Sequence, residues 1–481
     1  MRAFENIQKN LGEISIKNIS IDHKSRDEIP HILFGLQYIY SNEHLKKDVK
    51  KILQTLIPEN VKSDFGRPGM HLWKILVLGC IRLGSNMDFD KLHNLANYHS
   101  QIREFLFHSE FDKSQYSLSC LKENIQLFTP EILNEISELV VKTGHDFIKK
   151  STKKEVLLIE ARSDSFVVET DVHYPTDTNL LFDAIRKIIE IMMDIPIEVG
   201  NSDWRQGRYL IKKFKRLLRQ IESMRKGVRN AKGENKKKQE KKFKKLHKKY
   251  LKSSKQIVER AQKKSEDSFF LKISTIFQLE NYIKHALRQI DQIERRVFQE
   301  EKIPHSEKVF SIFEPHTEWI SKGKSGVPQE LGVKVAIVED QYKFILTHEV
   351  MEKLEDKELA IPITKKTLRK YNDLKSISFD KGFYTASNKK VLNEVVKILV
   401  MPKKGKPAKE EQKDEYKKLR NHHSAVESAI NSLEHHGLNR VLDVGVDGFC
   451  RYVSLSILSR NIHTLGKLVR QQHIDQIKKV A

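Results

Sequence analysis

The sequence has few cysteines and no long apolar run, and each absence narrows the kinds of protein it can encode. Its 481 residues include three cysteines, Cys80, Cys120 and Cys450, which lie far apart and form no CxxC pair. They support neither a disulfide framework nor a zinc ribbon. The first residues, MRAFENIQKN, lack the apolar core of a signal peptide. No apolar run approaches the roughly 20 residues that span a bilayer, so we expect a soluble intracellular protein.

Acidic residues are also in deficit. The chain has 64 Asp and Glu against 87 Lys and Arg, a formal net charge of +23 and a pI near 9.5. This excess of positive charge gives the surface a positive potential, which attracts polyanions, nucleic acid first and anionic membrane second. The alternative is that the excess lysine only keeps long helices soluble. Hydrophobic residues make up 39% of the chain, enough for cores in roughly two to four domains.

Four segments of different character follow one another. They are a helical N-terminal domain at 1–150, the first part of an α/β domain at 151–200, a basic helical hairpin at 201–303, and the rest of the α/β domain with C-terminal helices at 304–481. In the first, Thr129, Pro130 and Glu131 together predict the start of a helix. Runs of β-branched and apolar residues predict strands at 155–173, in KVFSIF after Pro304, and in a hairpin that turns near residues 339–342.

The hairpin segment contains the densest positive charge, in NKKKQEKKFKKLHKKYLKSSK. Its later part places apolar residues at alternating steps of three and four, which predicts a coiled-coil seam. These residues are Ile283, Ala286, Ile290, Ile293 and Val297. The lysines of the segment either contact phosphates or only solvate a long helix, and the sequence does not choose between the two.

Isolated carboxylates at strand ends and on a helix suit phosphoryl transfer that uses two divalent metal ions. Mg²⁺ prefers such oxygen ligands and leaves positions for water and phosphate. Asp380 ends the short strand in SISFDKGFY, where Gly382 makes the turn, and Glu427 lies on a helix in HHSAVESAINSLEHHG. A third carboxylate from the first strand region is needed. The residues alone leave four candidates there, Asp164, Glu169, Asp171 and Asp177.

Several stretches in one order resemble the DDE transposases of bacterial insertion sequences, most closely the ISNCY-like group. They are SDSFVVETDVHYPTDTNLLFDAIR, FSIFEPHTEWISKGKSGVPQELGVKVAIVED, SFDKGFY and HHSAVESAINSLEHHGLNRV. In addition, FGRPGMHLWKILVLGCIRLGSNMDFDKLHNLANYH resembles the family's helical N-terminal domain, which implies that the segment 1–150 binds DNA. The resemblance implies a ribonuclease H-like α/β catalytic domain, interrupted here by the lysine-rich helices. It also implies that Asp164, Asp380 and Glu427 are catalytic and bind Mg²⁺, for which Mn²⁺ can substitute.

The chain departs from the family pattern in three places. Ser165 and Phe166 follow Asp164 where the family usually has two threonines. Asp171 stands where the family has Asn, which leaves it as an alternative ligand to Asp164. Glu434 stands seven residues after Glu427, where many members have a basic residue that contacts DNA. Phosphate contacts are then expected from other residues beside the motifs. These are Lys322 and Lys324 of WISKGK, together with His173 and His316.

The function implied by the resemblance is DNA transposition. The chain is expected to bind the terminal inverted repeats of its own element, to cleave at each end in a metal-dependent reaction, and to join the ends to target DNA. Because two ends are joined together, a homodimer or larger synaptic assembly is expected, with the seam at 276–297 as one candidate interface. The expected location is the bacterial cytoplasm, at the nucleoid. The alternatives are an inactive DNA-binding remnant and a metal-dependent DNA nuclease.

Overall fold

The computed structural model divides the chain into two compact units. The described residues are 2–5, 11–57, 69–153, 155–195, 204–266, 272–321, 329–403, 405 and 409–480. The first unit comprises Met1–Asp171 with Glu318–Ala481, and the second comprises Val172–Thr317. Helices predominate, and the strands in the described ranges form one mixed sheet of seven. The expected mixed α/β class is therefore confirmed.

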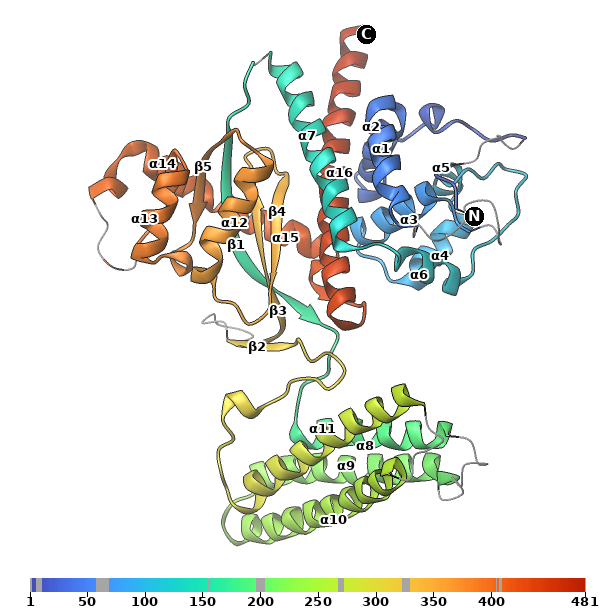
Figure 1. Cartoon of the computed structure of the whole chain (residues 1–481), viewed down its shortest axis with the longest axis vertical. Helices are drawn as coiled ribbons and strands as arrows, with labels where there is room; N and C mark the ends of the chain where they lie inside the picture. The colour runs from blue at the N-terminus through green and yellow to red at the C-terminus, as the bar shows by residue number, and fades with distance from the viewer. Residues whose placement is uncertain are drawn as a thin grey trace. The chain divides into compact units, whose positions relative to one another are not determined.

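The sheet of the first unit is built around its longest strand, β1 (Figure 1). The strands are β1 (Ile159–Thr170), β2 (Glu318–Ser321), β3 (Gln329–Glu339), β4 (Ile345–Met351), β5 (Leu374–Phe379), β6 (Ile398–Val400) and β7 (Arg440–Val441). On one side of β1 lie β3 and then β4, each antiparallel to its neighbour, which confirms the expected hairpin. On the other side lie β5 and then β6, both parallel to β1. The short strands β2 and β7 pair with parts of β3 and β1.

Helices cover both faces of this sheet, as two neighbouring residues of β4 demonstrate. The Thr347 hydroxyl lies 2.7 Å from that of Thr367 on α12 (Asp356–Lys370). The next residue, His348, makes a 3.1 Å hydrogen bond to Ser454 on α16 (Gly445–Val480). Because successive side chains of a strand point to opposite faces, α12 and α16 lie on opposite sides of the sheet. The remaining helices after β5 are α13 (Ala386–Val395), α14 (Asp414–His423) and α15 (Ala425–Leu433).

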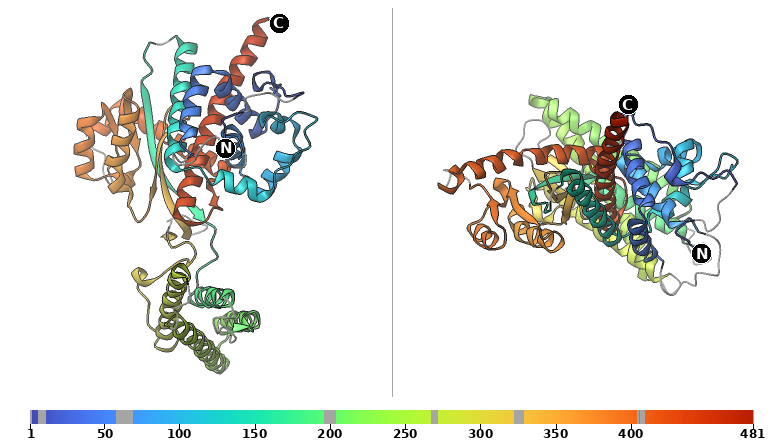
Figure 2. Two further views of the ribbon diagram at one scale, coloured as in Figure 1. Left: turned by 45° about the vertical axis from the view of Figure 1, so that its right-hand side comes forward. Right: turned by 90° about the horizontal axis from the view of Figure 1, so that it is seen from above.

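The N-terminal helices gather around the same long helix, α16, which α1, α3 and α7 contact directly (Figures 1 and 2). They are α1 (Glu28–Ser41), α2 (Glu43–Gln54), α3 (Leu72–Gly84), α4 (Phe89–Tyr98), α5 (Ser100–Phe105), α6 (Leu118–Ile125) and α7 (Pro130–Thr152). The hydroxyl of Thr129 accepts a hydrogen bond from the Ile132 amide, which confirms the predicted start of α7. Apolar residues of these helices and of the sheet form one continuous core, so 1–150 is part of the first unit.

The second unit is a group of four helices with a core of its own. They are α8 (Asp177–Asp194), α9 (Gly207–Asn230), α10 (Gly233–Glu266) and α11 (Ile273–Phe298). We expected a two-helix insertion at 201–303, but α8 belongs to the same unit. The reason is its apolar face, where Leu181, Ile185 and Ile188 are fully buried in that core.

Two further expectations about this unit are corrected. The seam residues Ile283, Ala286, Ile290 and Ile293 are buried inside the unit, where α11 packs against α8 and α10, so this part of the 276–297 seam is not free for dimer formation. The stretch KVFSIF is not a strand, because its apolar residues pack against the helices instead of a sheet neighbour. Within the described residues, no helix has the length and apolar character that crossing a membrane requires.

Candidate active site

Strand register brings two of the predicted carboxylates together. Asp164 lies in the middle of β1, between its antiparallel neighbour β3 and its parallel neighbour β5. In the parallel pair, Ser163 of β1 is opposite Phe379, the last residue of β5. The next residues along the two strands are Asp164 and Asp380. The sheet itself therefore determines that these two carboxylates are neighbours.

The third carboxylate comes from α15, which packs against β1. The buried face of this helix presents Val426, Ala429 and Leu433 to the core, and Glu427 lies on its exposed side. The π-helical turn Glu434–Leu438 follows, and Gly437 within it has a φ of +95°, a conformation that favours glycine. The helix therefore ends at the glycine-containing turn, with Glu427 near its first turn.

Asp164, Asp380 and Glu427 line one open pocket of about 580 Å³ in the first unit. The other lining residues are Ser165, Phe166, His423, Ser424, Val426, Ile430, Asn431 and Glu434. Three carboxylates that are far apart in the sequence thus reach one hollow from a strand, a strand end and a helix. Glu434 adds a fourth acidic side chain to its wall.

The electrostatics of the pocket are dominated by burial and by like charge. Burial, together with the like charges of Asp380, Asp356 and Glu427, raises the pKa of Asp164 to about 6, and the Ser165 amide, which donates a 2.7 Å hydrogen bond to the carboxylate, opposes the shift. A carboxyl in this setting resists ionisation because burial and like charge both disfavour its charged form. Perturbed carboxyls that share a cleft are typical of functional sites.

Asp356 is a site residue that the sequence did not predict. It is the first residue of α12 and accepts a 2.7 Å hydrogen bond from the Ser165 hydroxyl. Lys334 of β3 lies 3.3 Å from the same carboxylate. Gly382, directly after the β5 strand end, leaves room for it, since a Cβ there would lie 3.3 Å from Asp356 Oδ2. Asp356 thus fixes Ser165, the residue next to Asp164, and the two residues are far apart in the sequence.

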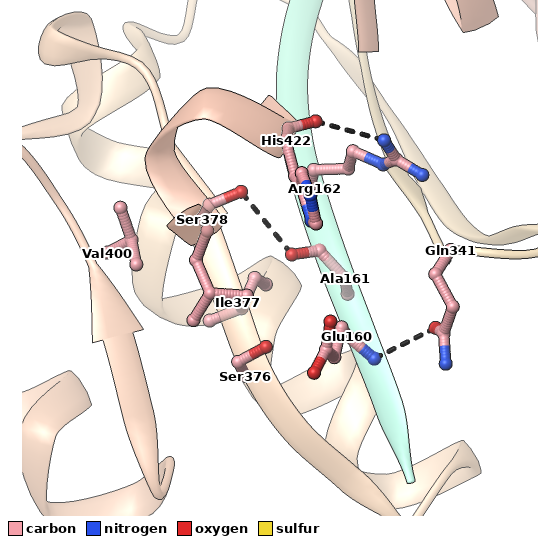
Figure 3. Close-up of a pocket in the computed structure, with 10 residues that line it drawn as sticks. Glu160, Ala161, Arg162, Gln341, Ser376, Ile377, Ser378, Val400 and His422 are labelled. Atoms are coloured by element: carbon pink, nitrogen blue, oxygen red, sulfur yellow. Dashed lines mark hydrogen bonds between the residues drawn. The ribbon is translucent and has the colours of Figure 1, made fainter. Parts of the chain in front are cut away.

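A second set of contacts holds α14, the helix that precedes α15, against the sheet, and Figure 3 shows the one between Arg162 and His422. Arg162 of β1 donates a 3.0 Å hydrogen bond to the carbonyl oxygen of His422, near the end of α14. The Ser378 hydroxyl lies 3.4 Å from the Ala161 carbonyl and 3.0 Å from Nδ1 of His423. Burial lowers the pKa of His423, although Asp380 and Glu427 oppose that shift. The imidazole is therefore a neutral hydrogen-bonding group at the rim of the carboxylate pocket.

The other predicted residues have different surroundings. Asp171, the alternative ligand, follows the end of β1, does not line the pocket, and lies 3.6 Å from Arg440. His173 and His316 belong to the second unit. There His173 pairs with Asp183 at 2.7 Å, a hydrogen bond that raises the pKa of the histidine, and His316 lies 3.6 Å from Glu314. Lys322 and Lys324 lie outside the described residues.

The carboxylates of the pocket suit a hard divalent cation. They supply only oxygen donors, and the raised pKa of Asp164 means that a bound cation would offset unfavourable charge. The carboxylate oxygens of the pocket do not all lie within 4.8 Å of one another. Among the described residues, the one group of potential ligand atoms that close together is that of Glu28, His31 and His463. Two-metal sites place their ions about 3.5–4 Å apart, so ligands of such a pair need not crowd one point.

The cluster of Glu28, His31 and His463 is already satisfied by the protein. The Arg470 guanidinium donates to Nε2 of His31 at 3.1 Å, while Nδ1 of that ring lies 2.9 Å from the Asp27 carbonyl. Arg460 lies 3.1 Å from Nδ1 of His463, whose Nε2 faces Glu28. Guanidinium groups only donate, so both imidazole lone pairs are used. A cation bound to both histidines would have to displace Arg470 from His31, and it would then be repelled by the positive charge of Arg460 beside His463.

Comparison with protein-family models, with curated proteins and with solved structures finds no match. The function is therefore inferred from the residues of this chain.

Proposed function

We propose that the chain is a DDE-type DNA transposase that binds the terminal inverted repeats of an insertion sequence and cleaves and joins DNA with Mg²⁺. The observation that supports this most is the convergence of Asp164, Asp380 and Glu427 on one pocket. The sequence motifs indicate these three residues independently of the fold. Carboxylates this far apart in the sequence would not be expected to line one pocket unless they acted together.

The sheet supports a ribonuclease H-like catalytic domain. That fold has three antiparallel strands next to two parallel strands, with the first strand in the centre. The order β4-β3-β1-β5-β6 has the same directions, with α12 between β4 and β5 and α13 between β5 and β6. One carboxylate in the central strand and another at the end of its parallel neighbour fit that arrangement.

Asp164, Asp380 and Glu427 would hold the metal ions. Bound divalent ions supply a Lewis acid and lower the pKa of water, which is the chemistry that phosphodiester cleavage needs. The chain's own residues perform the rest. Asp356 holds Ser165, whose amide donates to the Asp164 carboxylate, and Arg162 fixes the end of α14. The open pocket would admit a phosphate backbone. The net charge of +23 favours binding of a polyanion.

The test uses labelled duplex DNA that contains the ends of the coding region's own element. Full-length protein is incubated with Mg²⁺ or Mn²⁺, with EDTA as the control. We expect metal-dependent cleavage at the ends and joined products with a target plasmid. Cleavage without joining would identify a nuclease instead, and binding without any cleavage would identify an inactive remnant.

A further inference from the structure

The second unit, Val172–Thr317, holds most of the excess positive charge of the chain. It contains 34 Lys and Arg against 19 Asp and Glu, a net charge of +15 out of +23. Residues 207–266, which span α9 and α10, contain 24 of these cations and only five acidic residues. This charge lies outside the carboxylate pocket, whose residues all belong to the first unit.

Few of the lysines of α10 pair with an acidic side chain that the structure describes. Lys244 pairs with Glu300, and Lys255 pairs with Glu294. A helix that needs charge only for solubility gains stability by alternating acidic and basic residues one turn apart. The helix α10 instead repeats lysine at that spacing, which destabilises it through repulsion. Solubility alone does not account for this pattern.

The fold directs the lysines of α10 outward in a line. Tyr250, Leu251, Ile257 and Val258 bury one side of the helix in the core of the unit. The opposite side exposes four lysines at steps of four, three and four residues, which we call the lysine stripe. Its members are Lys241, Lys245, Lys248 and Lys252. At a rise of 1.5 Å per residue, the stripe is about 16 Å long.

A hollow of about 750 Å³ lies beside the stripe. Three lysines and one glutamate of α10 line it, Lys248, Lys252, Lys255 and Glu259, together with Glu294 and Phe298 of α11. The surface beside the stripe is therefore concave, and lysines of α10 lie along one side of the hollow.

We propose that the lysine stripe binds the phosphate backbone of duplex DNA and holds the DNA independently of the carboxylate pocket. The identity of the polyanion rests on the proposed function. Duplex DNA presents about one charge per 1.7 Å of axis, so a 16 Å stripe spans several phosphates. Lysine ammonium groups bind phosphates as point charges and read no bases. The stripe therefore increases affinity without adding sequence preference.

The experiment compares two full-length variants that lose equal charge. The first replaces Lys241, Lys245, Lys248 and Lys252 by glutamine, which has a similar helix propensity. The control replaces four exposed lysines of the first unit in the same way, Lys365, Lys390, Lys397 and Lys478. Binding of a random-sequence 30-base-pair duplex is measured from low to high salt, and circular dichroism checks that helix content is unchanged.

We expect the stripe variant to bind at least about tenfold more weakly at 0.15 M salt, and the slope of log Kd against log salt to fall by about three to four. The control should stay within about twofold of wild type. Equal weakening of both variants, or none in the stripe variant, would overturn the proposal.

Two further results separate this proposal from others. If the stripe variant loses binding to phosphatidylserine vesicles but keeps DNA binding, the stripe is a membrane surface and the proposal fails. A second outcome combines wild-type protein that never cleaves element ends with a stripe variant that binds DNA more weakly. In that case the proposed enzymatic function fails, and the proposal that the lysine stripe binds DNA stands.

Discussion

Replacing Asp380 by asparagine is expected to lower DNA cleavage and joining by about 10³-fold while DNA affinity stays within about twofold. The side chain keeps its shape, but a neutral amide is a poor ligand for Mg²⁺, so the ion that would offset the negative charge of the phosphate transition state is lost. DNA affinity should persist because the lysine stripe is unaffected. The measurement is a time course of strand cleavage on labelled element-end DNA.

A matched control lies beside the same strand, β5. Asp373 precedes β5 at its other end, is exposed and does not line the pocket. Asp373→Asn should therefore cleave at the wild-type rate. Equal activity of Asp380→Asn and wild type would show that the pocket does not perform the reaction.

Replacing Asp164 by asparagine is expected to stabilise the metal-free protein at pH 8. The folded-state pKa of Asp164 is about 6, against 3.8 for an ordinary aspartate. The folded state therefore binds more protons than the unfolded state between these values, and the stability from this group falls as pH rises through that window. Above it, the ionised carboxylate costs up to about 3 kcal/mol, at 1.36 kcal/mol per pKa unit.

Denaturant unfolding in EDTA at pH 8 and pH 4 measures this effect. The gain in unfolding free energy of Asp164→Asn should be largest at pH 8 and small at pH 4, where the wild-type side chain is mostly protonated in the fold. Asp171→Asn is the control, because Asp171 is exposed beside Arg440, and it should change the unfolding free energy by no more than about 0.5 kcal/mol. A loss of stability in Asp164→Asn at pH 8 would contradict the charge assignment.

The sequence predicted much of the candidate site because its signals are local. Asp380 ends a short strand, Glu427 lies on an amphipathic helix, and the hairpin and the start of α7 have recognisable turn and cap residues. Residue periodicity could not choose Asp164 over the other acidic residues of its region. The register with β5 does so, because it places Asp164 next to Asp380. Register depends on pairing across the inserted unit, which no local pattern contains.

What the sequence missed depends on contacts between distant segments. Asp356 reaches Ser165 across 191 positions of the chain. The apolar seam of α11 correctly indicated a helix face that packs against other helices, but the expected dimer interface was wrong, because the seam packs against α8 and α10 of the same chain. KVFSIF has the apolar content of a strand, yet its neighbours in the fold are helices. In each case the sequence pattern indicates that a residue is buried or charged, and only the folded structure shows which residues it contacts.

Binding of Mn²⁺ to the full-length protein, followed by electron paramagnetic resonance of the free ion, tests most directly whether the carboxylate pocket holds divalent cations. Wild type, Asp380→Asn, Glu427→Gln and Glu28→Gln are compared. We predict that wild type and Glu28→Gln bind Mn²⁺ alike, and that Asp380→Asn and Glu427→Gln bind at least about tenfold more weakly. Unchanged binding in both pocket variants, with loss in Glu28→Gln, would place the metal at the histidine cluster and contradict the account.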